Sequence, residues 1–182
     1  MKTVKNGHKR HIRLDAILLI IGVVCLSIFA GISYYNAMEE KRSRETVQQL
    51  RSMRDVGIAP RVDSSQTDTE KQDAITTSYE QLFEANADMI GWLNIPGTQI
   101  DYPVMQTLED EEYYLRRNFY KEKDKNGCLL MDTDSDIHMA GANLIIHGHN
   151  MKSGDMFGTL QDYQDQEYGM EHNKLYLSLI HI

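Results

Sequence analysis

The sequence predicts a mainly β fold: a β-barrel with short helices, incomplete at the C-terminal end, behind one N-terminal transmembrane helix. Three observations predict it. Residues 16–33 form an uncharged apolar run. Between residues 90 and 176, short apolar segments alternate with turn and loop residues, as expected for many short strands. These strands number about five, and so few seldom close a barrel.

The apolar run has the length and the flanks of a membrane anchor. About 20 apolar residues span a bilayer core, and Leu14, Tyr34 and Tyr35 extend the run at its edges. Five cations precede it, with no acidic residue among the first thirteen: Lys2, Lys5, Lys9, Arg10 and Arg13. This bias predicts a cytoplasmic tail at 1–13, an anchor at 14–35 and an extracellular remainder. A cleaved signal peptide is the alternative, but its apolar region would be shorter, about 7–15 residues.

The charge of the exported part excludes one class of partner. The chain has 19 basic and 27 acidic side chains; without the five N-terminal cations and Asp15, 14 basic and 26 acidic ones remain. Phosphate binding needs clustered cations, so nucleic acid is not an expected partner.

Two cysteines leave little room for disulfide chemistry. Cys25 lies within the predicted membrane span, and Cys128 is the other cysteine of the chain. The predicted extracellular part therefore has no intrachain disulfide among these residues. Cys128 stands in an apolar segment and is expected to be a small buried hydrophobe.

We expect residues 36–74 to form a polar juxtamembrane helix and a linker. Asn36–Val56 is rich in charged residues and glutamine and can continue as a helix until Gly57 and Pro60. Val62–Asp73 has one apolar residue in twelve, too little to offset its ordering entropy, so we expect a linker.

The folded domain is expected at residues 75–176. Tyr79, Leu82, Phe83 and Ala87 are spaced like one helical face. Expected strands are Ile90–Ile95, Thr98–Gln106 broken by Pro103, Cys128–Met131, Leu144–His147 and a segment from Lys174 onward; expected helices are Glu109–Tyr120, Asp155–Tyr163 and Gln164–His172. Trp92 and Tyr102 are expected in the core.

Two histidines stand at the end of an apolar strand. Leu144–Ile146 leads directly into His147, Gly148 and His149, and a polar loop follows. A side chain where a buried strand meets a loop is held rigidly but still reaches a ligand, as a general acid or base requires. Gly148 is expected to leave room for a substrate backbone.

A metal site is the competing interpretation of this segment. His147 and His149 share a strand face and could bind zinc with Asp132 or Asp134 nearby. Three or four ligands are needed and the spacing does not supply them, so no cofactor or metal is expected. His147 is then a packing or hydrogen-bonding residue.

The acidic stretch Asp132–Asp136 superficially resembles the start of a calcium loop. Such a loop needs Gly at its sixth position and Glu at its twelfth, where this chain has Ile137 and Asn143. A solvated loop is therefore expected.

Four blocks in order resemble the class B sortases, membrane-anchored cysteine transpeptidases of Gram-positive bacteria. They are N-A-D-M-I-G-W-L-N-I-P-G-T-Q-I-D-Y-P-V-M-Q at Asn86–Gln106, Y-Y-L at Tyr113–Leu115, G-C-L-L-M-D at Gly127–Asp132 and I-I-H-G-H-N-M-K-S-G-D-M-F-G-T-L at Ile145–Leu160. The resemblance implies a sortase-like barrel. It also implies that the histidine of the G-H-N segment, His149, is catalytic.

The resemblance further implies a reaction and its partners. A sortase cleaves a C-terminal sorting signal of a surface protein and joins that protein to an amino group of peptidoglycan or a pilin. The family also uses a cysteine in a T-L-x-T-C context and a later arginine, and neither is in this sequence. The family pattern puts Cys128 on an early strand, away from the nucleophile position. The chain as given is therefore expected to be inactive.

The last residues look foreign to this family. L-S-L-I-H-I at Leu177–Ile182 resembles a translated sequencing adapter, so 75–176 is expected to be a partial sortase domain and 177–182 a non-native tail. The alternative function is a non-catalytic membrane-anchored adhesion or scaffold module derived from a sortase.

Overall fold

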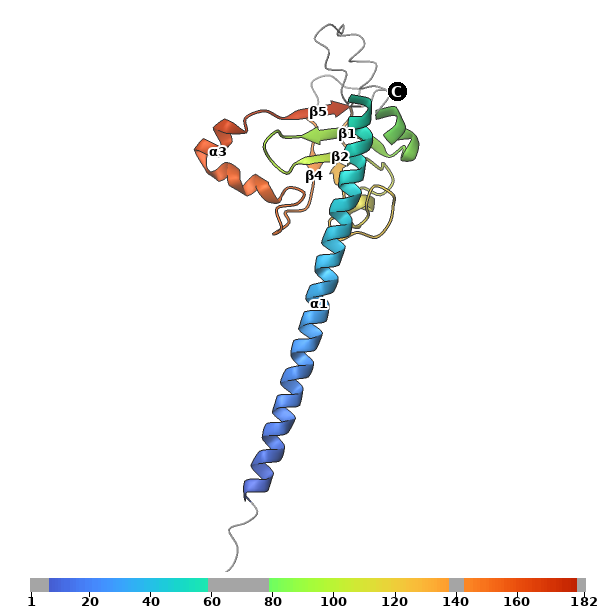
Figure 1. Ribbon diagram of the computed structural model, residues 1–182. Helices are drawn as coiled ribbons and strands as arrows, with labels where there is room; N and C mark the ends of the chain where they lie inside the picture. The colour runs from blue at the N-terminus through green and yellow to red at the C-terminus, as the bar shows by residue number, and fades with distance from the viewer. Residues whose placement is uncertain (1–6, 59–78, 138–142, 180–182) are drawn as a thin grey trace, which may run out of the picture. The chain divides into compact units, whose positions relative to one another are not determined.

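The computed structural model describes residues 7–58, 79–137 and 143–179 of the chain (Figure 1). Its contacts divide the chain into two units, Met1–Lys41 and Arg42–Ile182, and each is described by itself. Helix α1, Gly7–Ile58, contributes to both.

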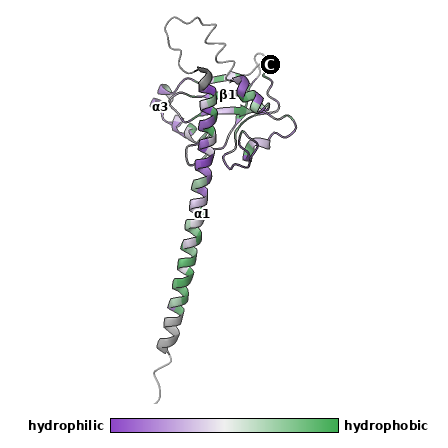
Figure 2. Cartoon of the chain, turned by 45° about the vertical axis from the view of Figure 1, so that its right-hand side comes forward, coloured by the Kyte–Doolittle hydropathy of each residue, from purple (hydrophilic) through white to green (hydrophobic). Residues whose placement is uncertain are grey.

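The first unit is the N-terminal part of α1. From Leu14 to Tyr35 every side chain of the helix is exposed. Figure 2 shows this stretch in the hydrophobic colour. By length and composition the helix is apolar enough to cross a membrane. A helix that is apolar all round needs an apolar environment, which agrees with the predicted transmembrane helix.

The second unit contains a five-stranded mixed sheet in the order β4-β3-β2-β1-β5. The strands are β1 Met89–Asn94, β2 Asp101–Met105, β3 Leu129–Met131, β4 Ile146–His147 and β5 Tyr176–Leu179. The pair β2–β3 is parallel and the other three pairs are antiparallel. The short helices are η1 Tyr113–Arg116, η2 Gly158–Gln164 and α3 Gln166–Glu171, and residues 79–85 are also helical. The prediction of a mainly β fold with short helices is confirmed, and β4 and β5 are the edges of an open sheet.

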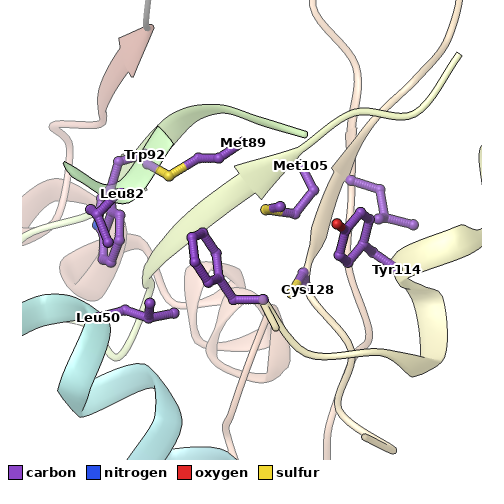
Figure 3. Packing of buried hydrophobic residues seen from close by; sticks show 9 residues of the cluster. Leu50, Leu82, Met89, Trp92, Met105, Tyr114 and Cys128 are labelled. Atoms are coloured by element: carbon purple, nitrogen blue, oxygen red, sulfur yellow. The ribbon is translucent and has the colours of Figure 1, made fainter. Parts of the chain in front are cut away.

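The larger aromatic side chains gather on one side of the sheet with a residue of α1. Trp92, Tyr114 and Phe119 are buried there with Leu82 and with Leu50, which is 1% exposed (Figure 3). Cys128 lies in the same cluster, and Trp92 is buried as predicted. The sequence predicts a fold that begins at residue 75, but Leu50 belongs to its core. The juxtamembrane helix from Arg42 onward is therefore part of the folded unit.

Two arginines of α1 fix this helix to the β1–β2 hairpin. The Arg54 guanidinium lies 4.6 Å from the centre of the Trp92 ring and pairs with the Asp101 carboxylate. Arg51 Nε lies 3.1 Å from Asp101 Oδ2, and the Trp92 indole donates to Asp101 at 2.7 Å. Burial opposes ionisation of Asp101, but the hydrogen bonds from Arg54 and Trp92 outweigh it and lower its pKa.

The C-terminal segment of the described chain completes one edge of the sheet. In β5, Leu177 pairs with Leu93 and Leu179 with Gly91, and both leucines pack on the core. Leu177–Leu179 thus belong to a strand, in line with the strand expected from Lys174 onward. Residues 180–182 lie outside the described residues, and the non-native origin of the six residues stays a prediction.

Candidate active site

His149 lies just beyond the edge strand β4 and is half-buried. Its Nε2 atom is 2.9 Å from the carbonyl oxygen of Leu115 in η1. A carbonyl only accepts hydrogen bonds, so the neutral imidazole carries its proton on Nε2 and keeps a lone pair on Nδ1. The ring is thereby oriented and one nitrogen is free to exchange a proton, as general acid–base catalysis requires.

A glycine packs closely against the carbonyl group that orients His149. Gly127 has a positive φ of 62°, and a Cβ atom there would lie 2.6 Å from the Tyr114 carbonyl oxygen and closer still to that of Leu115. Only glycine permits this approach. The backbone N–H of the next residue, Cys128, donates a hydrogen bond to the Tyr114 carbonyl oxygen at 3.0 Å. The start of β3 therefore supports the end of η1 against which His149 rests.

The loop that follows His149 folds back on itself. Phe157 donates its backbone N–H to the His149 carbonyl at 2.9 Å, and Asn150 and Met156 form an antiparallel bridge. The N–H of Met156 donates to the buried Tyr102 hydroxyl at 3.1 Å. The backbone of His149 is thus tied to the loop and, through the loop, to β2.

Packing explains why a glycine stands at position 148, and the expectation that it leaves room for a substrate backbone stays a prediction. A Cβ atom there would lie 2.5 Å from a methyl carbon of Leu129 and 2.8 Å from the Phe157 ring. The side chains of Leu129 and Phe157 fill the place that a Cβ atom of residue 148 would take.

An ion pair connects this loop to α1. Asp155 is buried, and both of its carboxylate oxygens lie 3.1 Å from Arg44 Nε, with Arg44 Nη2 at 3.0 Å from Oδ2. The Ser153 hydroxyl also donates to this carboxylate at 2.7 Å. Beside the pair lies a cavity of about 490 Å³, whose lining includes Arg44, Arg51 and Asp155 but not His149.

His147 points to a different set of neighbours. Its Nε2 atom lies 3.2 Å from Asp132 Oδ2 and 3.9 Å from Glu111 Oε1. The two histidines therefore do not share a zinc site as the alternative interpretation of the sequence suggested, since the His149 ring contacts the Leu115 carbonyl and the His147 ring contacts carboxylates. Asp134 offers only its backbone N–H, which donates to Asp132 Oδ1 at 2.8 Å. The calcium-loop alternative reaches into 138–142, outside the described residues.

Neither cysteine of the chain is placed as a reactive thiol. Cys128 is 7% exposed, and burial raises the pKa of its thiol, which disfavours the thiolate. It is the buried hydrophobe that the sequence predicts. Cys25 lies on the exposed apolar stretch of α1.

Comparisons with known proteins point to one group of enzymes. No family model matches the chain. Sortase B of Listeria monocytogenes is 31% identical over 155 residues, which are 85% of this chain and 58% of that protein. Sortase B of Staphylococcus aureus is 26% identical over 164 residues, 90% of this chain and 62% of that protein. The chain thus spans about three-fifths of the length of these curated relatives.

Solved structures give the same picture of the fold. Sortase B of Bacillus anthracis in complex with AAEK1 superposes with a TM-score of 0.64 at 31% identity, covering 78% of this chain and 63% of that one. A Staphylococcus aureus sortase B–substrate complex superposes with a TM-score of 0.66 at 25% identity, covering 78% and 61%.

Proposed function

Because the chain belongs, over the region that it shares with its relatives, to the class B sortase family, we propose that it is the histidine-bearing part of a cysteine transpeptidase. The proposed enzyme cleaves the C-terminal sorting signal of a surface protein and transfers that protein to an amino group of peptidoglycan or a pilin. A cysteine thiolate attacks a peptide carbonyl, the C-terminal fragment leaves as an amine, and the acceptor amine displaces the sulfur.

His149 is proposed as the acid and base of both steps. The leaving nitrogen needs a proton, and the acceptor amine must lose one as it attacks. The observation that carries this role is the 2.9 Å contact between His149 Nε2 and the Leu115 carbonyl oxygen, which orients the ring and leaves Nδ1 available.

The nucleophile is proposed to lie outside these 182 residues. Cys128 is buried with a raised pKa, and Cys25 belongs to the apolar helix. The cysteine and the arginine that the family uses are proposed to follow in the longer gene product. The 182-residue chain alone is accordingly expected to show no turnover.

The proposed place of action is the outer face of the cell membrane. The uncharged run at 16–33 anchors the chain, and the cations before it favour a cytoplasmic N-terminus. The partners are a sorting-signal peptide and a cell-wall or pilin amine. Support for a peptide partner comes from the staphylococcal sortase B, which has been solved with a substrate.

A reading of the gene and one assay test this function. The DNA beyond codon 176 should encode a T-L-x-T-C segment and a later arginine. The ectodomain extended by that sequence should cleave sorting-signal peptides and transfer them to an added amine. An extended, folded ectodomain that neither cleaves nor transfers any sorting signal contradicts the proposal.

A second candidate is a non-catalytic membrane-anchored adhesion or scaffold module. The burial of Cys128 favours it, since these residues carry no reactive external thiol. An in-frame native stop codon near position 176 would support this candidate over the enzyme.

A further inference from the structure

We propose that Glu111, Asp132 and His147 form a binding site for a divalent transition-metal ion of the zinc type. Their ligand atoms, one from each residue, all lie within 4.8 Å of one another. The three residues come from three separate segments: the loop before η1, the residue after β3, and β4.

The distances are close to those that a metal ion needs. Tetrahedral zinc ligands at about 2.1 Å from the ion lie about 3.4 Å apart. His147 Nε2 is 3.2 Å from Asp132 Oδ2 and 3.9 Å from Glu111 Oε1. Small rotations of the partly exposed Glu111 and His147 side chains therefore suffice to close the site, and water can take the fourth position.

The central ligand is already held in place. The backbone N–H of Asp134 donates to Asp132 Oδ1 at 2.8 Å, so Oδ2 is the oxygen turned toward His147. The backbone N–H of Asp132 donates to the Ile145 carbonyl at 2.9 Å, beside the pairing of Met131 with Ile146. Metal-binding carboxylates are typically oriented by such a second hydrogen bond.

The type of ligand selects the class of ion. One imidazole nitrogen and two carboxylate oxygens suit zinc and its neighbours in the first transition row, whereas calcium and magnesium prefer oxygen alone. Binding uses the Nε2 lone pair of His147 and so places the ring proton on Nδ1. The bound ion would connect the edge strand β4 to the loop before η1.

Calorimetric titration of the detergent-solubilised 182-residue protein with zinc chloride tests the site. The chain has seven histidines, so the informative quantity is the difference between matched variants. His147→Gln and Glu111→Gln should each remove one equivalent of bound zinc or weaken it at least tenfold, since loss of supporting groups alone costs about 10–100-fold. Glu112→Gln and Asp134→Asn are the controls, because neither side chain is among the three ligands.

Thermal unfolding gives a second readout that does not depend on turnover. With zinc in about hundredfold excess over the dissociation constant, the Tm of the wild type should rise by at least about 3 °C, and that of His147→Gln should not. The proposal is overturned if zinc binds equally to the wild type, the two ligand variants and the two control variants, or if His147→Gln binds as many zinc ions as the wild type. The three residues would then form only an ion-pair cluster. Equal loss of zinc in the two control variants would likewise overturn it.

Discussion

The imidazole of His149 and the carbonyl of Leu115 meet at 2.9 Å, although 34 residues separate them in the chain. The contact joins the end of β4 to the end of η1. The backbone of Gly127 packs closely against η1, and the Cys128 N–H donates to the Tyr114 carbonyl of η1, so we expect the orientation of the candidate catalytic ring to depend on the residues that lead into β3.

Gly127→Ala should destabilise the fold and disturb His149. Left-handed backbone costs a residue with a Cβ about 1–2 kcal/mol, and the added methyl group meets two carbonyl oxygens. We expect the free energy of unfolding to fall by at least about 1 kcal/mol, and the imidazole NMR signals of His149 to move. Gly169→Ala is the control, since its Cβ has no neighbour closer than 3.6 Å. Unchanged His149 signals in folded Gly127→Ala would contradict the link.

Arg44→Met should loosen the loop that follows His149. The substitution leaves the buried Asp155 carboxylate without its bidentate partner. Backbone amides of residues 150–158 should exchange with deuterium faster than in the wild type. Arg42→Met is the matched control: its pair with Glu122 is exposed on both sides, 69% and 53%, and such pairs contribute at most about 1 kcal/mol. Equal exchange in the two variants would show that the Arg44–Asp155 pair does not hold the loop.

Asp101→Asn should destabilise the contact between α1 and the β1–β2 hairpin in a pH-dependent way. The variant loses charge-assisted bonds to Arg54 and Trp92, which contribute roughly 1.5–3 kcal/mol. The folded pKa of Asp101 is lowered, so this stabilisation is present above the unfolded pKa of about 3.9 and disappears as the pH falls below it.

Denaturant unfolding at several pH values measures this dependence. The stability difference between wild type and Asp101→Asn should be constant near neutral pH and shrink below about pH 3.9. Asp162→Asn, at an exposed position, should show neither effect. A difference that grows with acidification would contradict the assignment.

The strands could be predicted from the sequence better than the role of α1. Alternating and apolar runs placed β1 to β4 within a few residues, since strand pairing follows side-chain alternation. The segment 109–120, expected to be a helix or a helical turn, contains only the short turn η1, and Asn118 beyond it is buried, with its side chain in hydrogen bonds to the loop. The docking of α1 was missed. Leu50 is the only fully buried leucine in the described part of this helix, which is too little to form an apolar stripe in the sequence. The arginines that pair with Asp101 have the composition of a solvent-exposed helix face.

The candidate site was predictable only in part. His149 stands out by its place after an apolar strand, but its partner is a backbone carbonyl, which no side-chain pattern reveals. Gly127 and Asp155 occur in the blocks that resemble the family, yet their contacts to η1 and α1 depend on tertiary packing. Glu111 was missed as a neighbour of His147 because it comes from a separate loop.

Topology can be tested on intact cells. Protease added outside should digest the region after Tyr35 and spare an N-terminal tag, because five cations precede the apolar run. Protection of the C-terminal region until the cells are permeabilised would show the opposite orientation.

Transpeptidation by histidine variants of the gene-extended ectodomain tests the central claim most directly. His149→Ala should lower the rate of transfer of a sorting-signal peptide to an amine by about 10²–10⁴-fold, as expected for loss of a positioned acid–base group. His147→Ala and Cys128→Ala should retain most of the activity, with folding of all variants verified by circular dichroism. Near-normal turnover by His149→Ala, or loss of turnover in His147→Ala alone, would contradict the assignment of His149.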